Sequence, residues 1–228
     1  MNDELEGMAR NFYGFGRWGA PYWFIGLEPA GDNQALRAEA FKKLEKDGLC
    51  DCKEFHSEIK VDWSRKPQKT WKRLTLLLKS FLGENCEKEL PDKGNLAQTL
   101  RNYQYSRWGS RDGNTCVIEL RGLNTKDNAA YKTICDTELD RRITYINKKL
   151  KASIEKPKLV VMYGKTEKDR WEDVVKFSLI LDCPVRHGPT TFVFAYHPNA
   201  HGSKGDYWLK DLYWESLGTR AREVSNEF

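Results

Sequence analysis

Four short apolar runs along the chain, each bounded by turn-forming residues, are typical of buried β-strands. We expect strands at 22–25, 115–120, 159–163 and 191–196. Helix-forming residues, with apolar side chains at helical spacing in several segments, predict helices at 3–12, 34–46, 69–82, 136–151 and 167–181. Strands that alternate with helices favour a largely parallel sheet covered on both faces. The sequence therefore predicts an α/β fold, a three-layer α/β/α sandwich around a mostly parallel sheet of four strands.

The segments between these elements give less regular patterns. Residues 47–69 carry mixed charge with little period, and we expect a long loop or an insertion there. Three glycines, Gly14, Gly16 and Gly19, interrupt regular structure near the amino end. The whole chain, 1–228, has 39% apolar residues and can bury one core, so we expect a single domain and a monomer.

Composition adds information about partners and location. The net charge of +5 and the aromatic content of 12% fit a partner that is anionic and stackable, such as DNA. The acidic amino end is unlike a signal peptide, and no apolar run reaches membrane length. We expect a cytoplasmic protein with no membrane association.

The six cysteines were considered as metal ligands. Cys50 and Cys52 form a C-x-C pair with His56 four residues on, which could be half of a zinc site. No second ligand pair of standard spacing follows. We therefore expect reduced thiols, no bound metal and no cofactor.

The first apolar run ends in a loop that carries one carboxylate. Gly26 and Gly31 bracket this turn, and Glu28 is held just before Pro29, whose fixed φ restricts the backbone. Open α/β sheets bind their ligands at the carboxyl ends of strands. Glu28 is therefore the first candidate for a catalytic residue.

The last predicted strand ends in a second informative stretch. His197 directly follows the apolar run, Pro198 restricts its turn, and His201 and Lys204 come close behind. Histidine has an unperturbed pKa that suits acid–base chemistry. In a parallel sheet this strand end lies at the same edge as Glu28, so we expect the two side chains to face one cleft.

These two strand ends resemble the signature of the uracil-DNA glycosylase superfamily. Gly26-Leu27-Glu28-Pro29 is similar to the family motif written G-Q-D-P-Y-H or G-I-N-P-G, and His197-Pro198-Asn199 is similar to its H-P-S or N-P-S motif. The resemblance implies the family fold and a monofunctional DNA glycosylase. Such an enzyme hydrolyses the N-glycosidic bond of a flipped-out base and leaves an abasic site.

The resemblance also implies roles for individual residues. Glu28 would orient or deprotonate the attacking water and stabilise positive charge on the sugar, and His197 would hydrogen-bond the oxygen of the departing base. Asn199 would contact the DNA backbone, and His201 would fill the gap left by the flipped base. The substrate- or DNA-binding candidates are Gly26, Leu27, Pro29, Gly31, Asp32, Asn33, Asn199, His201, Lys204, Arg121 and Asn124.

Departures from the family pattern bear on which base is excised. Where the family motif often continues into Tyr-His, this chain has Ala30-Gly31-Asp32, with less bulk to exclude a group at C5 of a pyrimidine. The asparagine that reads uracil at a strand end has no clear counterpart, since the polar residues after Val117-Ile118 are Glu119, Arg121 and Asn124. The predicted substrate is uracil or a modified pyrimidine such as glucosylated hydroxymethylcytosine, in DNA repair or in defence against phages.

Two alternatives remain open. The chain could be a noncatalytic module that grips DNA through Arg101, Arg107, Arg111 and Lys204, or an enzyme that hydrolyses free nucleosides or nucleotides. The base could stack on any of four aromatic side chains, each of which is also a good core residue: Trp23, Phe55, Tyr163 and Trp171.

Overall fold

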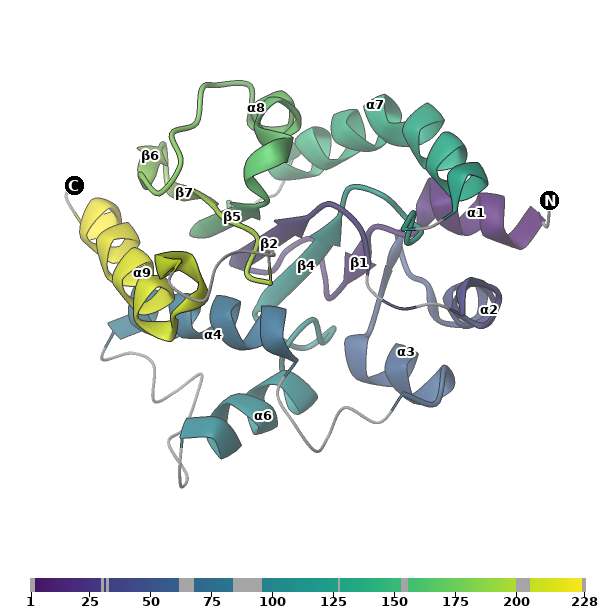
Figure 1. Cartoon of the computed structure of the whole chain (residues 1–228), viewed down its shortest axis with the longest axis horizontal. Helices are drawn as coiled ribbons and strands as arrows, with labels where there is room; N and C mark the ends of the chain where they lie inside the picture. The colour runs from purple at the N-terminus through teal and green to yellow at the C-terminus, as the bar shows by residue number, and fades with distance from the viewer. Residues whose placement is uncertain are drawn as a thin grey trace.

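In the computed structural model, helices pack on both faces of a central β-sheet (Figure 1). The structure describes residues 3–29, 31, 33–61, 68–83, 96–126, 128–152, 156–199 and 206–226. The strands are β1 Gly14–Phe15, β2 Tyr22–Gly26, β3 Leu49–Cys50, β4 Thr115–Glu119, β5 Leu159–Tyr163, β6 Val185–His187 and β7 Thr190–Ala195. The α-helices are α1 Asp3–Asn11, α2 Gln34–Leu44, α3 Cys52–Glu58, α4 Lys69–Leu82, α6 Leu96–Ser106, α7 Ala129–Ala152, α8 Lys168–Val175 and α9 Asp211–Asn226.

The four predicted strands form the parallel centre of the sheet, in the order β4-β2-β5-β7. Alternate side chains of each strand point to opposite faces. In β2, Tyr22 and Phe24 join the core on one face, whereas Trp23 and Ile25 join the core on the other. Both faces of these strands are apolar because both are covered, which is why they appear in the sequence as continuous apolar runs.

The prediction of a four-stranded sheet is wrong in its count. The described sheet is mixed and has seven strands, in the order β3-β1-β4-β2-β5-β7-β6. β1 and β6 run antiparallel to their inner neighbours, β4 and β7. The three added strands have only two or three residues each, too few to produce a periodic pattern.

The glycine-rich stretch near the amino end contains one of these strands. Gly14 has a φ of +129°, and a Cβ there would lie 2.0 Å from the carbonyl oxygen of Val117. Glycine therefore allows the backbone of β1 to approach β4. The expectation that these glycines interrupt regular structure is wrong for Gly14, whereas Gly16 and Gly19 lie outside the strand.

The helices form two layers, one on each face of the sheet. α7 and α8 cover one face, and α4, α6 and α9 lie on the opposite side (Figure 1). The helix predicted at 136–151 begins seven residues earlier, and the one predicted at 167–181 ends at Val175. α9 was not predicted. No described helix is both long enough and apolar enough to cross a membrane.

The segment 47–69, expected as a long loop or insertion, contains β3 and α3. Asp51 caps α3, since its carboxylate accepts hydrogen bonds from the backbone N–H groups of Lys53 and Glu54 at 3.0 and 3.1 Å. Phe55 and Ile59 then pack into the main core. A helix of seven residues is too short for its apolar spacing to stand out among charged neighbours.

A buried arginine on α7 connects three parts of the fold. Arg142 is fully buried, and its guanidinium donates five hydrogen bonds, of 2.5 to 3.1 Å, to backbone carbonyl groups. Burial lowers its pKa to about 10, so the group stays charged at neutral pH. The accepting carbonyls belong to Ala9, Arg10, Phe12, Glu119 and Leu120.

We expect Arg142→Met to lower the free energy of unfolding by at least about 3 kcal/mol, because each buried carbonyl left without a donor costs about 1–3 kcal/mol. The matched control is Arg141→Met, since the neighbouring Arg141 side chain is 46% exposed. The control should lose less than about 1 kcal/mol. Urea unfolding of both variants measures the difference, and equal losses would contradict the role assigned to Arg142.

Candidate active site

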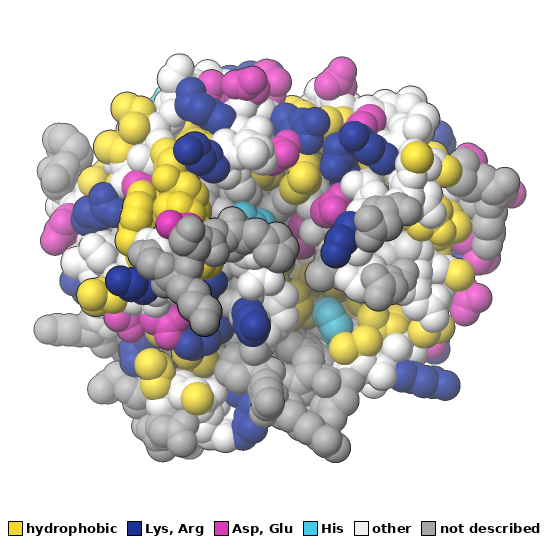
Figure 2. All heavy atoms as spheres, in the orientation of Figure 1, with side chains coloured by type: hydrophobic (Ala, Val, Ile, Leu, Met, Phe, Trp, Pro, Cys, Tyr) yellow, Lys and Arg dark blue, Asp and Glu magenta, His cyan; other side chains and the backbone are white. Residues whose placement is uncertain are grey.

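A cavity of about 370 Å³ opens at the carboxyl ends of the central parallel strands. Five of the residues predicted for the site line it: Glu28, Pro29, Gly31, His197 and Asn199. Figure 2 shows this face hollowed near its centre, with histidine side chains close to the hollow and Lys and Arg side chains spread around it. The remaining lining residues are Phe15, Arg37, His56, Ile59, Val61, Gln68, Thr70, Trp71, Glu119 and Tyr163.

The cavity lies where the chain reverses its direction across the sheet. After β2 the chain forms β3 and β4 on one side of β2, and then passes to β5 on the other side. Such a reversal leaves a crevice at the strand ends, where open α/β sheets bind their ligands. The loop that carries Glu28 leaves β2 at this point.

The loop after β2 is fixed by its backbone contacts with the end of β4. The N–H groups of Leu120 and Arg121 donate to the carbonyl oxygens of Gly26 and Leu27 at 2.9 and 2.7 Å. Gly26 also allows a close approach from β5, because a Cβ there would lie 2.4 Å from the hydroxyl oxygen of Tyr163. The position of Glu28 is thus set by both neighbouring strands.

The Glu28 carboxylate is held through one of its two oxygens. Oε2 accepts hydrogen bonds from the Thr125 hydroxyl at 2.5 Å and the Thr125 N–H at 3.2 Å, and lies 3.5 Å from Nη1 of Arg121. Arg121 in turn pairs with Asp136 at 2.6 Å. In the described part of the chain no donor reaches Oε1, so this oxygen can receive a water molecule or a ligand from the cavity.

His197 lies at the end of β7 with a defined protonation state. Burial lowers its pKa, so the imidazole is neutral at neutral pH. The N–H of Asn199 donates to Nδ1 at 3.1 Å, which places the ring proton on Nε2. The ring centroid lies 5.5 Å from that of Tyr163. His197 therefore offers one N–H donor at Nε2.

Other predicted residues support the loop from outside the cavity. Asn124 donates from Nδ2 to the Gly31 carbonyl at 3.0 Å, and Asn33 caps α2 by accepting a hydrogen bond from the N–H of Leu36 at 3.2 Å. Leu27 is half-buried against the core, and Arg121 holds Glu28. The predicted residues Asp32, His201 and Lys204 lie outside the described residues.

Two buried charged residues line the cavity and were given no role by the sequence analysis. Glu119 ends β4, and Arg37 lies on the inner side of α2; their exposed fractions are 6% and 5%. The available signals were the position of Glu119 at a strand end, as for Glu28, and the spacing of Arg37 with Ala38 and Phe41 on the buried side of one helix. Neither signal alone distinguishes a site residue from a structural one.

The Glu119 carboxyl is held in its protonated form by its surroundings. Its pKa is raised to about 8, mainly by burial and also by the nearby Glu28, while Arg37 and Arg142 act in the opposite direction. Burial, together with Glu119, also raises the pKa of Tyr163, so its phenol is neutral. At neutral pH the cavity therefore contains a carboxylic acid beside the partly exposed carboxylate of Glu28.

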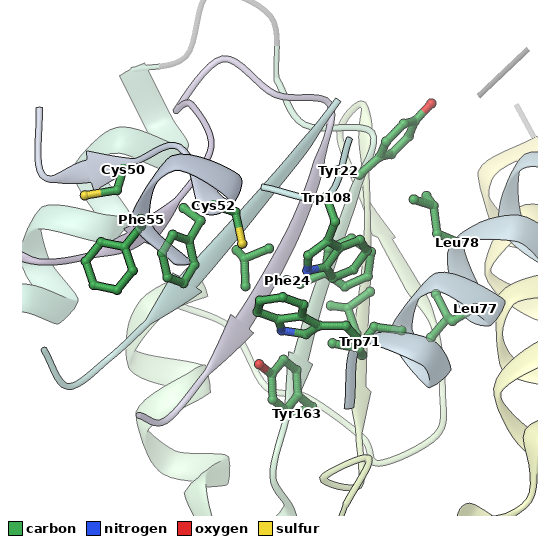
Figure 3. Packing of buried hydrophobic residues seen from close by; sticks show 14 of the residues in the cluster. Tyr22, Phe24, Cys50, Cys52, Phe55, Trp71, Leu77, Leu78, Trp108 and Tyr163 are labelled. Atoms are coloured by element: carbon green, nitrogen blue, oxygen red, sulfur yellow. The ribbon is translucent and has the colours of Figure 1, made fainter. Parts of the chain in front are cut away.

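Aromatic side chains form the wall of the cavity opposite the loops. Phe15 and Trp71 lie with ring centroids 6.4 Å apart, and the indole of Trp71 lies between Trp108 and Tyr163 (Figure 3). Of the four aromatic residues considered as stacking partners, only Tyr163 lines the cavity. The other three are fully buried in the core: Trp23, Phe55 and Trp171.

The Cys52 thiol lies 3.6 Å from Nδ1 of His56, but that nitrogen is engaged by the backbone. Nδ1 of His56 lies 2.7 Å from the carbonyl oxygen of Cys52, so it donates its proton there. Burial lowers the pKa of His56 to about 4 and raises the pKa of Cys52 well above its usual range. No group of three or more potential metal-ligating side chains gathers within the described ranges.

The stretch before β4 that carries Arg101, Arg107 and Arg111 begins within α6. Its aromatic side chains Tyr103 and Trp108 are buried in the core rather than open for stacking, whereas Tyr105 is exposed. Arg107 is exposed, and the guanidinium of Arg111 donates to the Leu44 carbonyl. Tyr103 and Trp108, which alternate with these arginines in the sequence, are therefore core residues.

The chain was also compared with known proteins. No protein-family model matches it, and neither does any curated protein.

The protonation state of Glu119 predicts how stability depends on pH. The folded protein binds this proton more tightly than the unfolded chain, whose carboxyl has the ordinary pKa of 4.5. The contribution of this group to stability is therefore largest below that pH and falls as the pH rises toward about 8. We expect Glu119→Gln to remove this fall and to be more stable than the wild type at pH 8, by on the order of 3 kcal/mol.

Urea unfolding between pH 4.5 and 8 tests this prediction, with Glu39→Gln as a control because Glu39 is exposed on α2. The control should keep the slope of the wild type. If Glu119→Gln keeps it as well, the carboxyl is ionised in the folded protein.

Proposed function

We propose that this protein is a monofunctional DNA glycosylase, a divergent member of the uracil-DNA glycosylase superfamily that releases uracil or a modified pyrimidine and leaves an abasic site. The observation that carries the proposal is the meeting of Glu28 and His197 at one cavity, from two strand ends 169 positions apart in the chain. The two motifs that resemble the superfamily are thus brought together in space. The role of the reaction in repair or in phage defence is part of the proposal.

The fixed position of Glu28 supports its proposed role in hydrolysis of a glycosidic bond. The bond breaks through a transition state in which positive charge develops on the sugar, and a carboxylate beneath the ring stabilises it. Oε2 is fixed by Thr125 and Arg121, which leaves Oε1 to bind the attacking water and accept its proton. The fixed carboxylate costs little reorganisation when the charge develops.

His197 supplies the complementary group for the departing base. Its neutral ring carries the proton on Nε2, which donates a hydrogen bond to an oxygen of the base as negative charge builds there. Because His197 is neutral, it adds no positive charge that would offset the negative charge of Glu28 near the sugar. The sugar and the base thus each receive the stabilisation that suits the charge they develop.

The cavity favours a base that has left the duplex. A glycosidic carbon inside stacked DNA is out of reach, so the nucleotide must flip into a pocket where it contacts aromatic side chains. Phe15, Trp71 and Tyr163 provide such contacts. A volume of about 370 Å³ lies within the range of small-molecule sites and leaves room for a substituent on the pyrimidine.

We expect Glu28→Gln to reduce base release by about 1000-fold, because an amide cannot take the proton of the attacking water. The assay is alkali-induced strand cleavage of duplexes containing uracil, hydroxymethyluracil, hydroxymethylcytosine or glucosylated hydroxymethylcytosine. DNA binding, measured by fluorescence anisotropy, should change little. Glu39→Gln, exposed and remote from the cavity, controls for handling of the protein.

Each outcome of the panel has a clear meaning. Cleavage of at least one duplex that is lost in Glu28→Gln supports the glycosylase. Salt-sensitive DNA binding without any abasic product supports a noncatalytic module, and release of base from free nucleosides alone supports a nucleoside hydrolase.

We expect His197→Ala to slow base release by about 100-fold, the usual effect of removing one donor to a developing anion. His187→Ala is the matched control, because that ring is exposed on β6 and stacks on Phe177 outside the cavity. Single-turnover rates at neutral pH measure both effects. A rate for His197→Ala equal to that of the control would remove His197 from the reaction.

A further inference from the structure

Glu119 and Arg37 line the cavity, and each has a buried polar atom without a partner among the described residues. Among the described residues, Oε2 of Glu119 and Nε of Arg37 are buried and make no hydrogen bond. Buried polar groups are almost always satisfied, so two such groups at one cavity indicate a ligand that supplies the missing partners.

The groups around Glu119 leave its carboxyl able to donate. Arg37 faces it from α2, Arg142 from α7, Glu28 from the loop after β2, and Tyr163 from β5. His56 on α3 lines the same cavity and is neutral. A protonated carboxyl presents one O–H donor and one carbonyl acceptor side by side.

This donor–acceptor pair has different consequences for the two kinds of pyrimidine. A uracil-type base carries a proton on N3. For this base a protonated carboxyl offers the same hydrogen bonds as an amide, one donor and one acceptor, and has no further advantage. A cytosine-type base presents an unprotonated N3 beside an amino group, and N3 can take a proton. A cytosine anion is a much poorer leaving group than a uracil anion, so protonation helps this base most.

We propose that Glu119 recognises a flipped 4-aminopyrimidine and protonates its N3 as the base leaves, so that the site favours cytosine-type over uracil-type bases. This inference rests on the proposed glycosylase function. The O–H of Glu119 donates to N3, and its other oxygen accepts from the amino group at C4. Glu119 is then a catalytic residue in addition to Glu28 and His197.

The step balances as follows. The bond between C1′ and N1 breaks, and its electron pair moves into the pyrimidine ring. The proton passes from Glu119 to N3, so the base leaves as a neutral molecule. Water adds to C1′ and gives its proton to Glu28. Arg37 stabilises the Glu119 carboxylate that remains until solvent returns the proton.

The sharpest test is Glu119→Gln, because the amide keeps a donor and an acceptor of the same shape but has no proton to transfer. We compare single-turnover release of hydroxymethylcytosine and glucosylated hydroxymethylcytosine with release of uracil and hydroxymethyluracil from otherwise identical duplexes. The ratio of cytosine-type to uracil-type rates should fall by about 100-fold in the variant, the usual size of general acid catalysis. Circular dichroism checks that the variant is folded.

The pH profile of the wild type is a second test that needs no variant. Release of a cytosine-type base should decline as the pH rises through about 8, where Glu119 ionises. Release of a uracil-type base should not decline as Glu119 ionises. Glu119→Gln should lose the decline for the cytosine-type base.

The outcomes separate this inference from the function on which it rests. If the wild type releases no base from any duplex, the proposed function fails and this inference fails with it. If the wild type releases only uracil-type bases, or if the ratio of rates is unchanged in Glu119→Gln, the role of Glu119 is overturned while the glycosylase stands. A fall in the ratio with loss of the alkaline decline supports both.

Discussion

The position of the cavity depends on the hydrogen bonds of one buried cation. Arg142 binds the carbonyls that end α1 and those of Glu119 and Leu120 at the end of β4. These hydrogen bonds tie the end of β4 to the end of α1. The same strand end pairs with the loop of Glu28 through Leu120 and Arg121. A buried contact thus supports the backbone that carries both Glu119 and the loop of Glu28.

The remainder of the site is assembled on this frame from segments that are far apart in the chain. The central parallel strands bring Glu28 and His197 to one edge of the sheet, as the order of the chain dictates. α3 and α4 then close the opposite side with His56 and Trp71. The described part of segment 47–69, with β3 and α3, therefore contributes to the cavity wall and is not a separate addition to the fold.

The sequence predicted the elements with the strongest local signals. The four central strands, α4 and the strand-end positions of Glu28 and His197 could be predicted, because long apolar runs and proline-bounded turns do not depend on distant neighbours. The short strands β1, β3 and β6 could not, since pairing rather than local preference makes them strands. The protonated state of Glu119 and the burial of Arg37 depend on contacts between β4 and α2, which no local pattern encodes. Whether the superfamily resemblance reflects function stays a prediction.

The turn after β7 has a consequence for how this site can vary among related sequences. The tautomer of His197 is fixed by the main-chain N–H of residue 199, and the side chain of Asn199 takes no part in that bond. Nineteen of the twenty standard amino acids carry such an N–H, and only proline lacks it. Any substitution at position 199 other than proline therefore keeps the hydrogen bond that fixes the His197 tautomer. The third residue of the His197-Pro198-Asn199 motif can then differ while His197 still presents its N–H donor at Nε2.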